Sequence, residues 1–222
     1  MKVSSQDRTR QPLRGRALVW RWFRTVTLAE LLGFSVPALV GATVSNSRPA
    51  VALPALLLAG SVEGAMLGLG QAAVLRRALP ELRTRTWIIA TSLAAAFAYL
   101  LGLTPSMLAN SISDWPIPLV VAGSVVLGLA LLASIGAAQW LVLRNLVSGS
   151  SSWIATTALA WLAGLAIFLG FAMPLWQPGQ PLILIIAIAI AGGFLMAATS
   201  SAITGTALRR LLQLRTSRAE DH

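Results

Sequence analysis

The stretch GAAQWLVLR, Gly136–Arg144, places one glutamine near the end of a long apolar run and finishes on an arginine. An earlier stretch, LGLGQAAVLRR, Leu67–Arg77, has nearly the same pattern: Gln71, like Gln139, stands five residues before the arginine. Self-similarity at a fixed spacing is sought before local features, because it decides the architecture. The recurrence indicates an internal repeat in an apolar chain.

The composition is that of a membrane protein. Of 222 residues, 56% are hydrophobic and 11% are charged, whereas soluble domains have roughly 25% charged residues. Six apolar runs can each cross a hydrocarbon core about 30 Å thick at about 1.5 Å per helical residue. These runs are Val26–Val44, Val51–Leu75, Trp87–Leu108, Ile117–Leu143, Trp153–Met173 and Leu182–Leu208. We therefore predict an all-α bundle of six transmembrane helices in a lipid bilayer.

The positive charge is distributed to one side of these spans. The net charge is +10, and of the 17 basic residues only Arg48 lies in a connector on the other side. This asymmetry is the one described by the positive-inside rule. It predicts a multi-pass membrane protein with cytoplasmic N- and C-termini. It also argues against nucleic acid as the partner of the basic residues.

The three odd-numbered spans align almost without gaps from a tryptophan near the start of each. These residues are Trp22, Trp87 and Trp153, at spacings of 65 and 66. The alignment predicts three helical hairpins, at about 22–79, 87–147 and 153–212. Because every hairpin begins on the same side, the repeats are parallel, with a pseudo-symmetry axis along the membrane normal.

The three even-numbered spans align on their final arginine. Gly68 then pairs with Gly136 and Gln71 with Gln139, whereas Thr204 takes the glutamine position in the third hairpin. The string Gly-x-x-Gln-Trp-x-x-Leu-Arg resembles a recurring feature of uncharacterised bacterial polytopic membrane proteins, and through the repeats this similarity covers most of the chain. The resemblance implies a class, that of multi-pass proteins of the bacterial plasma membrane (the inner membrane), and no activity. The layout of three hairpins also resembles that of the mitochondrial carriers, but the odd spans lack the Pro-x-Asp/Glu-x-x-Lys/Arg signature of that family.

The chain divides into a leader, a membrane domain and a tail. Residues 1–25 are predicted to be a basic cytoplasmic leader, 26–212 the six-span domain and 213–222 a cytoplasmic tail. From Arg10 to Arg24, a helical projection separates arginines from apolar and aromatic residues. That pattern is typical of an interfacial amphipathic helix bound to anionic lipid.

Two carboxylates interrupt the spans. Ionisable groups at membrane depth cost about 2.5 to 3.5 kcal/mol on insertion scales and are often functional. Counted from the nearest arginine, Glu30 lies about 9 Å deep and Gln71 and Gln139 about 7.5 Å, so that these residues and Thr204 are expected in one polar layer. Glu63 is expected on a second level about 10 Å away.

Two interpretations of these polar side chains stay open. In the first, Glu30 and Glu63 are stations on a path for a proton, a cation or a polar solute. In the second, the polar groups join helices through hydrogen bonds worth roughly 0.6 to 2 kcal/mol each in membranes. The structural interpretation is favoured for the glutamines, and the two are evenly matched for the glutamates.

Small residues predict where helices approach closely. Gly60, Gly64 and Gly68 follow one another at four-residue spacing on one face of the second span, and Gly136 matches Gly68 in the fourth. Such small-xxx-small steps are typical of tight helix packing in membranes.

The chain lacks the residue types that common metal sites and catalytic sites need. The chain has no cysteine, its single histidine is His222, and no span contains an aspartate. We therefore predict neither a metal site, nor a cofactor, nor an enzyme, although a lipid-modifying enzyme is a weak third alternative. The leading hypothesis is a small-solute or ion transporter with intramembrane carboxylates. The alternative is a non-transporting scaffold or accessory subunit that binds another membrane protein or a second copy of itself.

Overall fold

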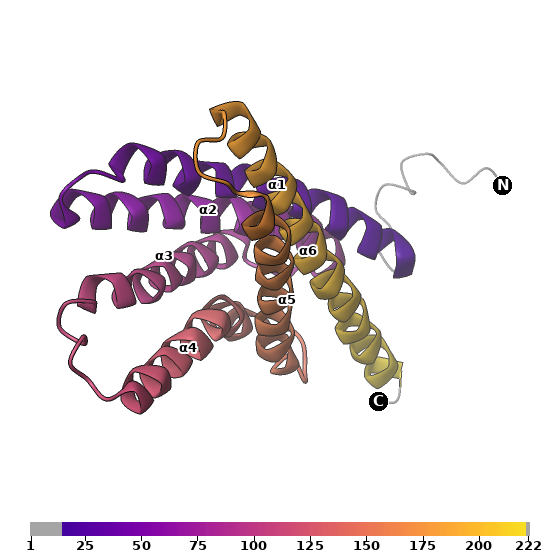
Figure 1. Ribbon diagram of the computed structural model, residues 1–222. Helices are drawn as coiled ribbons and strands as arrows, with labels where there is room; N and C mark the ends of the chain where they lie inside the picture. The colour runs from indigo at the N-terminus through magenta and orange to yellow at the C-terminus, as the bar shows by residue number, and fades with distance from the viewer. Residues whose placement is uncertain (1–14, 221–222) are drawn as a thin grey trace.

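A computed structural model describes residues 15–220 of the chain, with side chains to residue 213. These residues form six helices (Figure 1), namely α1 (Gly15–Val44), α2 (Pro49–Ala78), α3 (Thr84–Leu108), α4 (Ile117–Leu143), α5 (Ser152–Leu175) and α6 (Leu182–Glu220). All six are long and apolar enough to cross a membrane. The predicted all-α, multi-pass membrane protein is confirmed at this level.

The first and last helices are longer than the apolar runs indicate. The described part of the leader is the beginning of α1, and α6 continues through the predicted tail to Glu220. Leu18 and Trp22 are both buried inside the bundle, so this part of the leader packs against other helices instead of lying separately on a lipid surface. The rest of the predicted leader, residues 1–14, lies outside the described residues.

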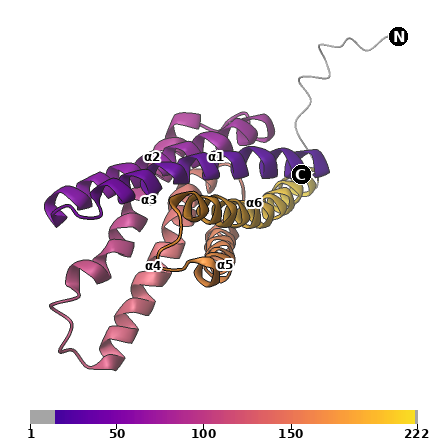
Figure 2. The same ribbon diagram turned by 45° about the horizontal axis from the view of Figure 1, so that its top comes forward.

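The six helices form a closed ring. Each helix packs against its two neighbours in sequence order, and α6 packs against α1. Figure 2 shows α1 beside α2 on one side and beside α6 on the other. This arrangement leaves a centre toward which all six helices can direct side chains.

The ring is tightly packed at only one end. We call it the basic end, because the connectors at 79–83 and 144–151 and the arginines of α1 and α6 lie there. Buried residues of α3 and α4 fall in the halves nearest this end, whereas the first turns of α4 are exposed, with Val126 at 65%. In Figure 1 the α3–α4 hairpin diverges from the α1–α2 hairpin toward the left. The exposed apolar halves are suited to contact with lipid.

Glycines set the close packing of α2 on α3. A Cβ atom on Gly64 would lie 2.7 Å from the carbonyl oxygen of Thr91 and 2.5 Å from the Cβ of Ala95. One on Gly68 would lie 3.1 Å from the Cα of Ile88, and Gly60 lies against the ring of Tyr99. Gly136 of α4 meets α5 in the same manner, because its Cβ would lie 3.0 Å from the Cα of Ile154.

A methyl group added at this crossing should therefore destabilise the bundle. We expect Gly64→Ala to lower the free energy of unfolding by about 1 to 3 kcal/mol, the usual cost of overpacking. The matched control is Gly123→Ala on α4, where an added Cβ meets nothing within 4 Å. Thermal unfolding of both variants in one mild detergent measures the difference. Equal unfolding temperatures would contradict the packing role of Gly64.

Candidate functional site

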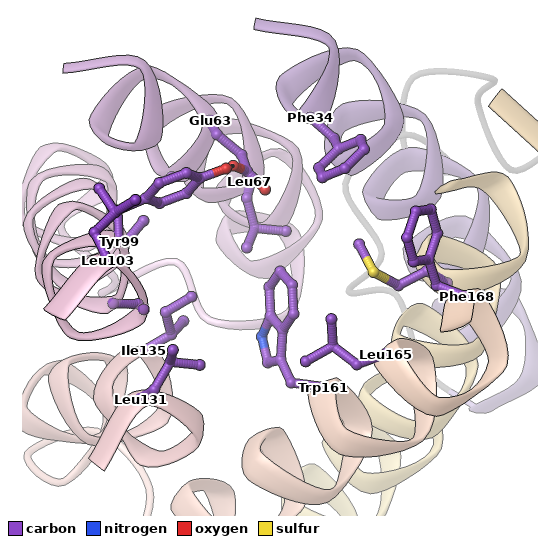
Figure 3. A pocket seen from close by; sticks show the side chains of 15 residues that line it. Phe34, Glu63, Leu67, Tyr99, Leu103, Leu131, Ile135, Trp161, Leu165 and Phe168 are labelled. Carbon is purple, nitrogen blue, oxygen red and sulfur yellow. Dashed lines mark hydrogen bonds between the residues drawn. The ribbon is translucent and has the colours of Figure 1, made fainter. Parts of the chain in front are cut away.

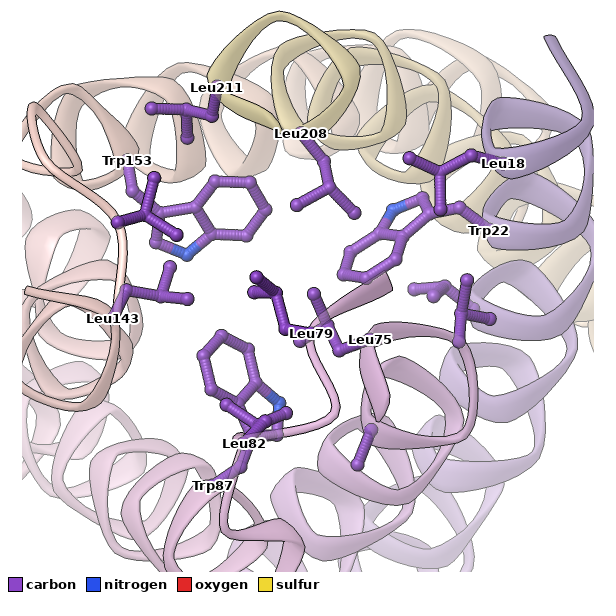
Figure 4. Close-up of a cluster of buried hydrophobic side chains, with 14 of the residues drawn as sticks. Leu18, Trp22, Leu75, Leu79, Leu82, Trp87, Leu143, Trp153, Leu208 and Leu211 are labelled. Atoms are coloured by element: carbon purple, nitrogen blue, oxygen red, sulfur yellow. The ribbon is translucent and has the colours of Figure 1, made fainter. Parts of the chain in front are cut away.

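A cluster of large side chains closes the basic end of the ring. Trp22, Trp87 and Trp153 are completely buried there, and they pack with leucines from the even helices and from the α2–α3 connector (Figure 4). Trp22 and Trp153 meet edge to face with ring centroids 6.1 Å apart. The cluster fills the centre of the ring at this end.

Each buried indole donates a hydrogen bond to a polar side chain of an even helix. Trp87 Nε1 donates to Gln71 Oε1 at 3.1 Å, and Trp153 Nε1 donates to Gln139 Oε1 at 2.8 Å. Trp22 Nε1 donates to Thr204 Oγ1 at 3.0 Å, which joins α1 to α6. A buried indole N–H requires such an acceptor, so the three bonds fix three helix pairs.

The two glutamines also bind each other. Gln139 Nε2 donates to Gln71 Oε1 at 2.7 Å and to Thr91 Oγ1 at 3.1 Å. The structure thus brings Gln71 and Gln139 into one network with Thr91, which the sequence reasoning did not identify. Thr91 falls one helical turn after Trp87, on the face of α3 that is directed inward.

Glu30 belongs to a second network and is sealed within the bundle. Its side chain is 2% exposed, and its two carboxylate oxygens accept hydrogen bonds from Ser200 Oγ at 2.9 and 3.0 Å. Thr204 donates to the carbonyl oxygen of Ser200 at 2.8 Å. Glu30 and Thr204 therefore meet through Ser200. Neither has a direct hydrogen bond to the glutamines, so the expected single polar layer consists of two networks.

Glu63 contacts a partner that the sequence analysis overlooked. Tyr99 Oη of α3 donates to Glu63 Oε2 at 2.6 Å. Tyr99 is the only tyrosine of the chain. Its place in the middle of an apolar span was a usable signal, because a buried phenol needs a hydrogen-bond partner.

The two glutamates are closer in height than the sequence indicated. A Cβ on Gly33 would lie 3.1 Å from the carbonyl oxygen of Glu63, so these residues share a level. Gly33 is three residues, or about 4.5 Å of helix, beyond Glu30. The expected 10 Å was too large because it took Arg24 of α1 and Arg76 of α2 to lie at the same depth. Gly70 packs beside Thr25 and Ala29, so Arg24 lies farther from the basic end than Arg76 does.

A cavity of about 360 Å³ lies inside the ring and is lined by residues of all six helices (Figure 3). Glu63 and Tyr99 stand in its wall, and nearly all the other lining side chains are apolar. Phe34, Trp161 and Phe168 contribute aromatic rings. Of the predicted polar residues only Glu63 lines this space; Glu30, Gln71, Gln139 and Thr204 do not.

This geometry suits binding of a small molecule better than it suits a metal. Among the described residues, no group of three or more His, Cys, Asp or Glu side chains could hold a metal ion. The volume and the mainly apolar lining are typical of ligand pockets, in which a few polar groups fix orientation.

Comparison with known proteins gave no relatives: no family model, no curated protein and no solved structure matches this chain.

The glutamine network should contribute measurably to stability. Gln139→Leu removes the acceptor of Trp153 and the two bonds to Gln71 and Thr91. Since membrane hydrogen bonds average about 0.6 kcal/mol each, we expect a loss of about 2 kcal/mol in the free energy of unfolding. Gln177→Leu, at the exposed α5–α6 turn, is the control. Unfolding in mixed micelles by an ionic detergent would measure both, and a Gln139→Leu protein as stable as the parent would contradict this role.

Proposed function

We propose that this chain is a transporter-like protein of the bacterial inner membrane, which binds a small solute or ion in the central cavity and carries it across the bilayer. Glu63 is the polar contact in the cavity, and Glu30 is a second station about one helical turn nearer the basic end. Both termini are cytoplasmic in this proposal, which places the basic end at the cytoplasmic face.

The observation that carries the proposal is a carboxylate in the wall of a cavity that all six helices build. A glutamate is a costly way to join two membrane helices, because an amide makes the same contact without a charge to desolvate. At the basic end, the amides of Gln71 and Gln139 already join helices in this way. A carboxylate beside open volume is better accounted for by an interaction with something that enters the cavity.

The proposal includes an architecture of three hairpin repeats, supported by contacts that recur at matched positions. Gly33 packs on the backbone of Glu63 as Gly164 packs on that of Met196, each with an added Cβ 3.1 Å from the carbonyl oxygen. The Trp87–Gln71 and Trp153–Gln139 bonds recur at a spacing of 66 and 68 residues. In this proposal the ring opens when the three similar hairpins move relative to one another around their common axis.

In the proposed third repeat, part of this hydrogen-bond network is absent. Thr157 occupies the position in α5 that Thr91 has in α3, but its Oγ1 is buried without a hydrogen-bond partner. Thr204 is shorter than the glutamine found in the other hairpins, and a threonine hydroxyl there bonds to its own helix. We infer that the glutamines and Thr204 hold the hairpins together, and that transport depends on the carboxylates.

Purified protein in sealed vesicles tests the proposed function. The probes are protons, followed with an internal pH dye, and radiolabelled organic cations, organic anions and neutral solutes, each added separately. We expect protein-dependent flux of one class, lowered at least about tenfold by Glu63→Gln, the factor that corresponds to 1.4 kcal/mol.

Glu81→Gln is the matched control, since it removes an exposed carboxylate in the α2–α3 connector. Glu30→Gln reports separately on the second station, and its flux is expected to fall as well. Flux that is unchanged when both Glu30 and Glu63 are replaced would remove the carboxylates from the mechanism.

A groove at the basic end supports the proposed interaction with anionic lipid. It holds about 410 Å³ between α1 and α6 and is lined by Arg16, Trp20, Phe23 and Arg209 among others. Nε of Arg209 is buried without a hydrogen-bond partner. The guanidinium carbon of Arg24 lies over the Trp20 ring, 5.9 Å from its centroid. Two guanidinium groups beside aromatic rings are suited to a lipid phosphate at the membrane surface.

Replacing the two groove arginines should weaken this lipid contact. Each Arg near a membrane surface contributes about 1 kcal/mol of attraction to anionic lipid, so Arg16→Gln and Arg209→Gln should each weaken phosphatidylglycerol binding about fivefold. Native mass spectrometry of lipid titrations measures the affinity. Arg48→Gln, at the opposite end, should leave the affinity for phosphatidylglycerol unchanged. An equal effect of all three replacements would show that only net charge matters, and would contradict lipid binding in the groove.

The alternative function is that of a non-transporting scaffold or accessory subunit. It is favoured by α4, where Gly123 and Gly128 have no atoms within 4 Å of an added Cβ, so that another membrane helix could approach closely. The flux experiment separates the two functions, because a scaffold moves none of the solute classes.

A further inference from the structure

The polar groups of the central cavity define what kind of ligand it can hold. The Glu63 carboxylate, the Tyr99 hydroxyl and the indole N–H of Trp161 are the polar side-chain groups among its lining residues; the other side chains are aliphatic or aromatic, and two positions are glycine. A ligand that fills such a space must be apolar over most of its surface, because a polar surface would lose its hydration without replacement.

The cavity holds one carboxyl group, that of Glu63, and no basic side chain is among the described residues that line it. Glu63 is 7% exposed and receives one hydrogen bond, from Tyr99 to Oε2. Among the residues with described side chains, no arginine, lysine or histidine lines the cavity. In apolar surroundings a carboxyl group is either protonated and neutral or ionised beside an opposite charge, and a ligand with a positive charge would supply that opposite charge.

Aromatic rings surround the same space. In Figure 3, Phe34 of α1 and Trp161 and Phe168 of α5 lie around the same central space as Glu63 and Tyr99, with Trp161 across that space from Glu63. The rings of Phe34 and Phe168 meet edge to face, with centroids 6.2 Å apart. Aromatic faces attract cations through the ring quadrupole, most strongly where water is excluded.

We propose that the solute of this cavity is a lipophilic organic cation: one positive charge carried inside an apolar or aromatic shell. Glu63 neutralises the charge, Tyr99 orients the carboxylate, and the aromatic rings contact the shell. This assignment of a substrate class rests on the proposed function. An organic anion would face the Glu63 charge, and Ca²⁺ would find one carboxylate where it takes six to eight oxygen ligands.

Equilibrium binding in nanodiscs tests this assignment with a pair of probes of similar shape. Radiolabelled methyltriphenylphosphonium carries the charge, and triphenylphosphine oxide is its neutral counterpart. We expect saturable binding of the cation above that of empty nanodiscs and at least tenfold weaker binding of the neutral compound. Glu63→Gln should weaken cation binding about thirtyfold or more, the lower range for removing one partner of a buried charge pair.

Three further variants make the result specific. Glu81→Gln should bind the cation as the parent does, since Glu81 lies outside the cavity. Trp161→Leu should weaken it several-fold by loss of an aromatic face. Tyr99→Phe should retain binding within a few-fold, because the carboxylate remains; this variant also shows that the loss in Glu63→Gln does not arise from breaking the Tyr99 bond.

The possible failures are distinct. Equal binding of both probes, or cation binding unaffected by Glu63→Gln in folded protein, would overturn the assignment to cations. Glu63-dependent flux of an anion or a neutral solute in the vesicle experiment would also overturn it, while leaving the proposed function in place. Absence of flux for every solute class would overturn the proposed function itself.

Discussion

The hydrogen bonds from three buried indoles to side chains of the even helices are the constraint on which the bundle depends. An indole N–H that is removed from water without an acceptor is strongly unfavourable, so Trp22, Trp87 and Trp153 each require a polar partner at one depth. Gln71, Gln139 and Thr204 provide these partners. The Trp22–Thr204 bond joins the first helix to the last and thereby closes the ring.

Tight packing of the ring at the basic end leaves room for the cavity farther along the helices. The tryptophans and leucines fill the centre at the basic end, while the helices diverge beyond it and leave the central cavity. The glycines of α2 keep α3 close enough for Tyr99 to reach Glu63 across the helix pair. The polar side chains thus fall into two groups. Gln71, Gln139 and Thr204 hold helices together at the packed end, and Glu63 lies in the wall of the cavity.

The sequence predicted the features that depend on periodicity and composition, such as the six spans and the glycine face of α2. It did not predict features that depend on how helices are offset along their axes. The height of Glu63 relative to Glu30 depends on how α1 and α2 pack at Gly33 and Gly70. Counting residues along each helix from its arginine does not reveal this offset. Ser200 is a common residue in membrane helices and gave no signal, whereas the single Tyr99 could have been recognised as a candidate partner of Glu63.

Reactivity of the two glutamates toward a membrane-permeant carbodiimide tests the central claim most directly. Dicyclohexylcarbodiimide modifies protonated carboxyl groups that it can reach in apolar surroundings, and peptide mass spectrometry locates the adduct. Because Glu63 lines the cavity and Glu30 is sealed against Ser200, the account predicts modification of Glu63, reduced when the cavity is occupied by methyltriphenylphosphonium, and little modification of Glu30. Modification of Glu30 in preference to Glu63 would contradict it.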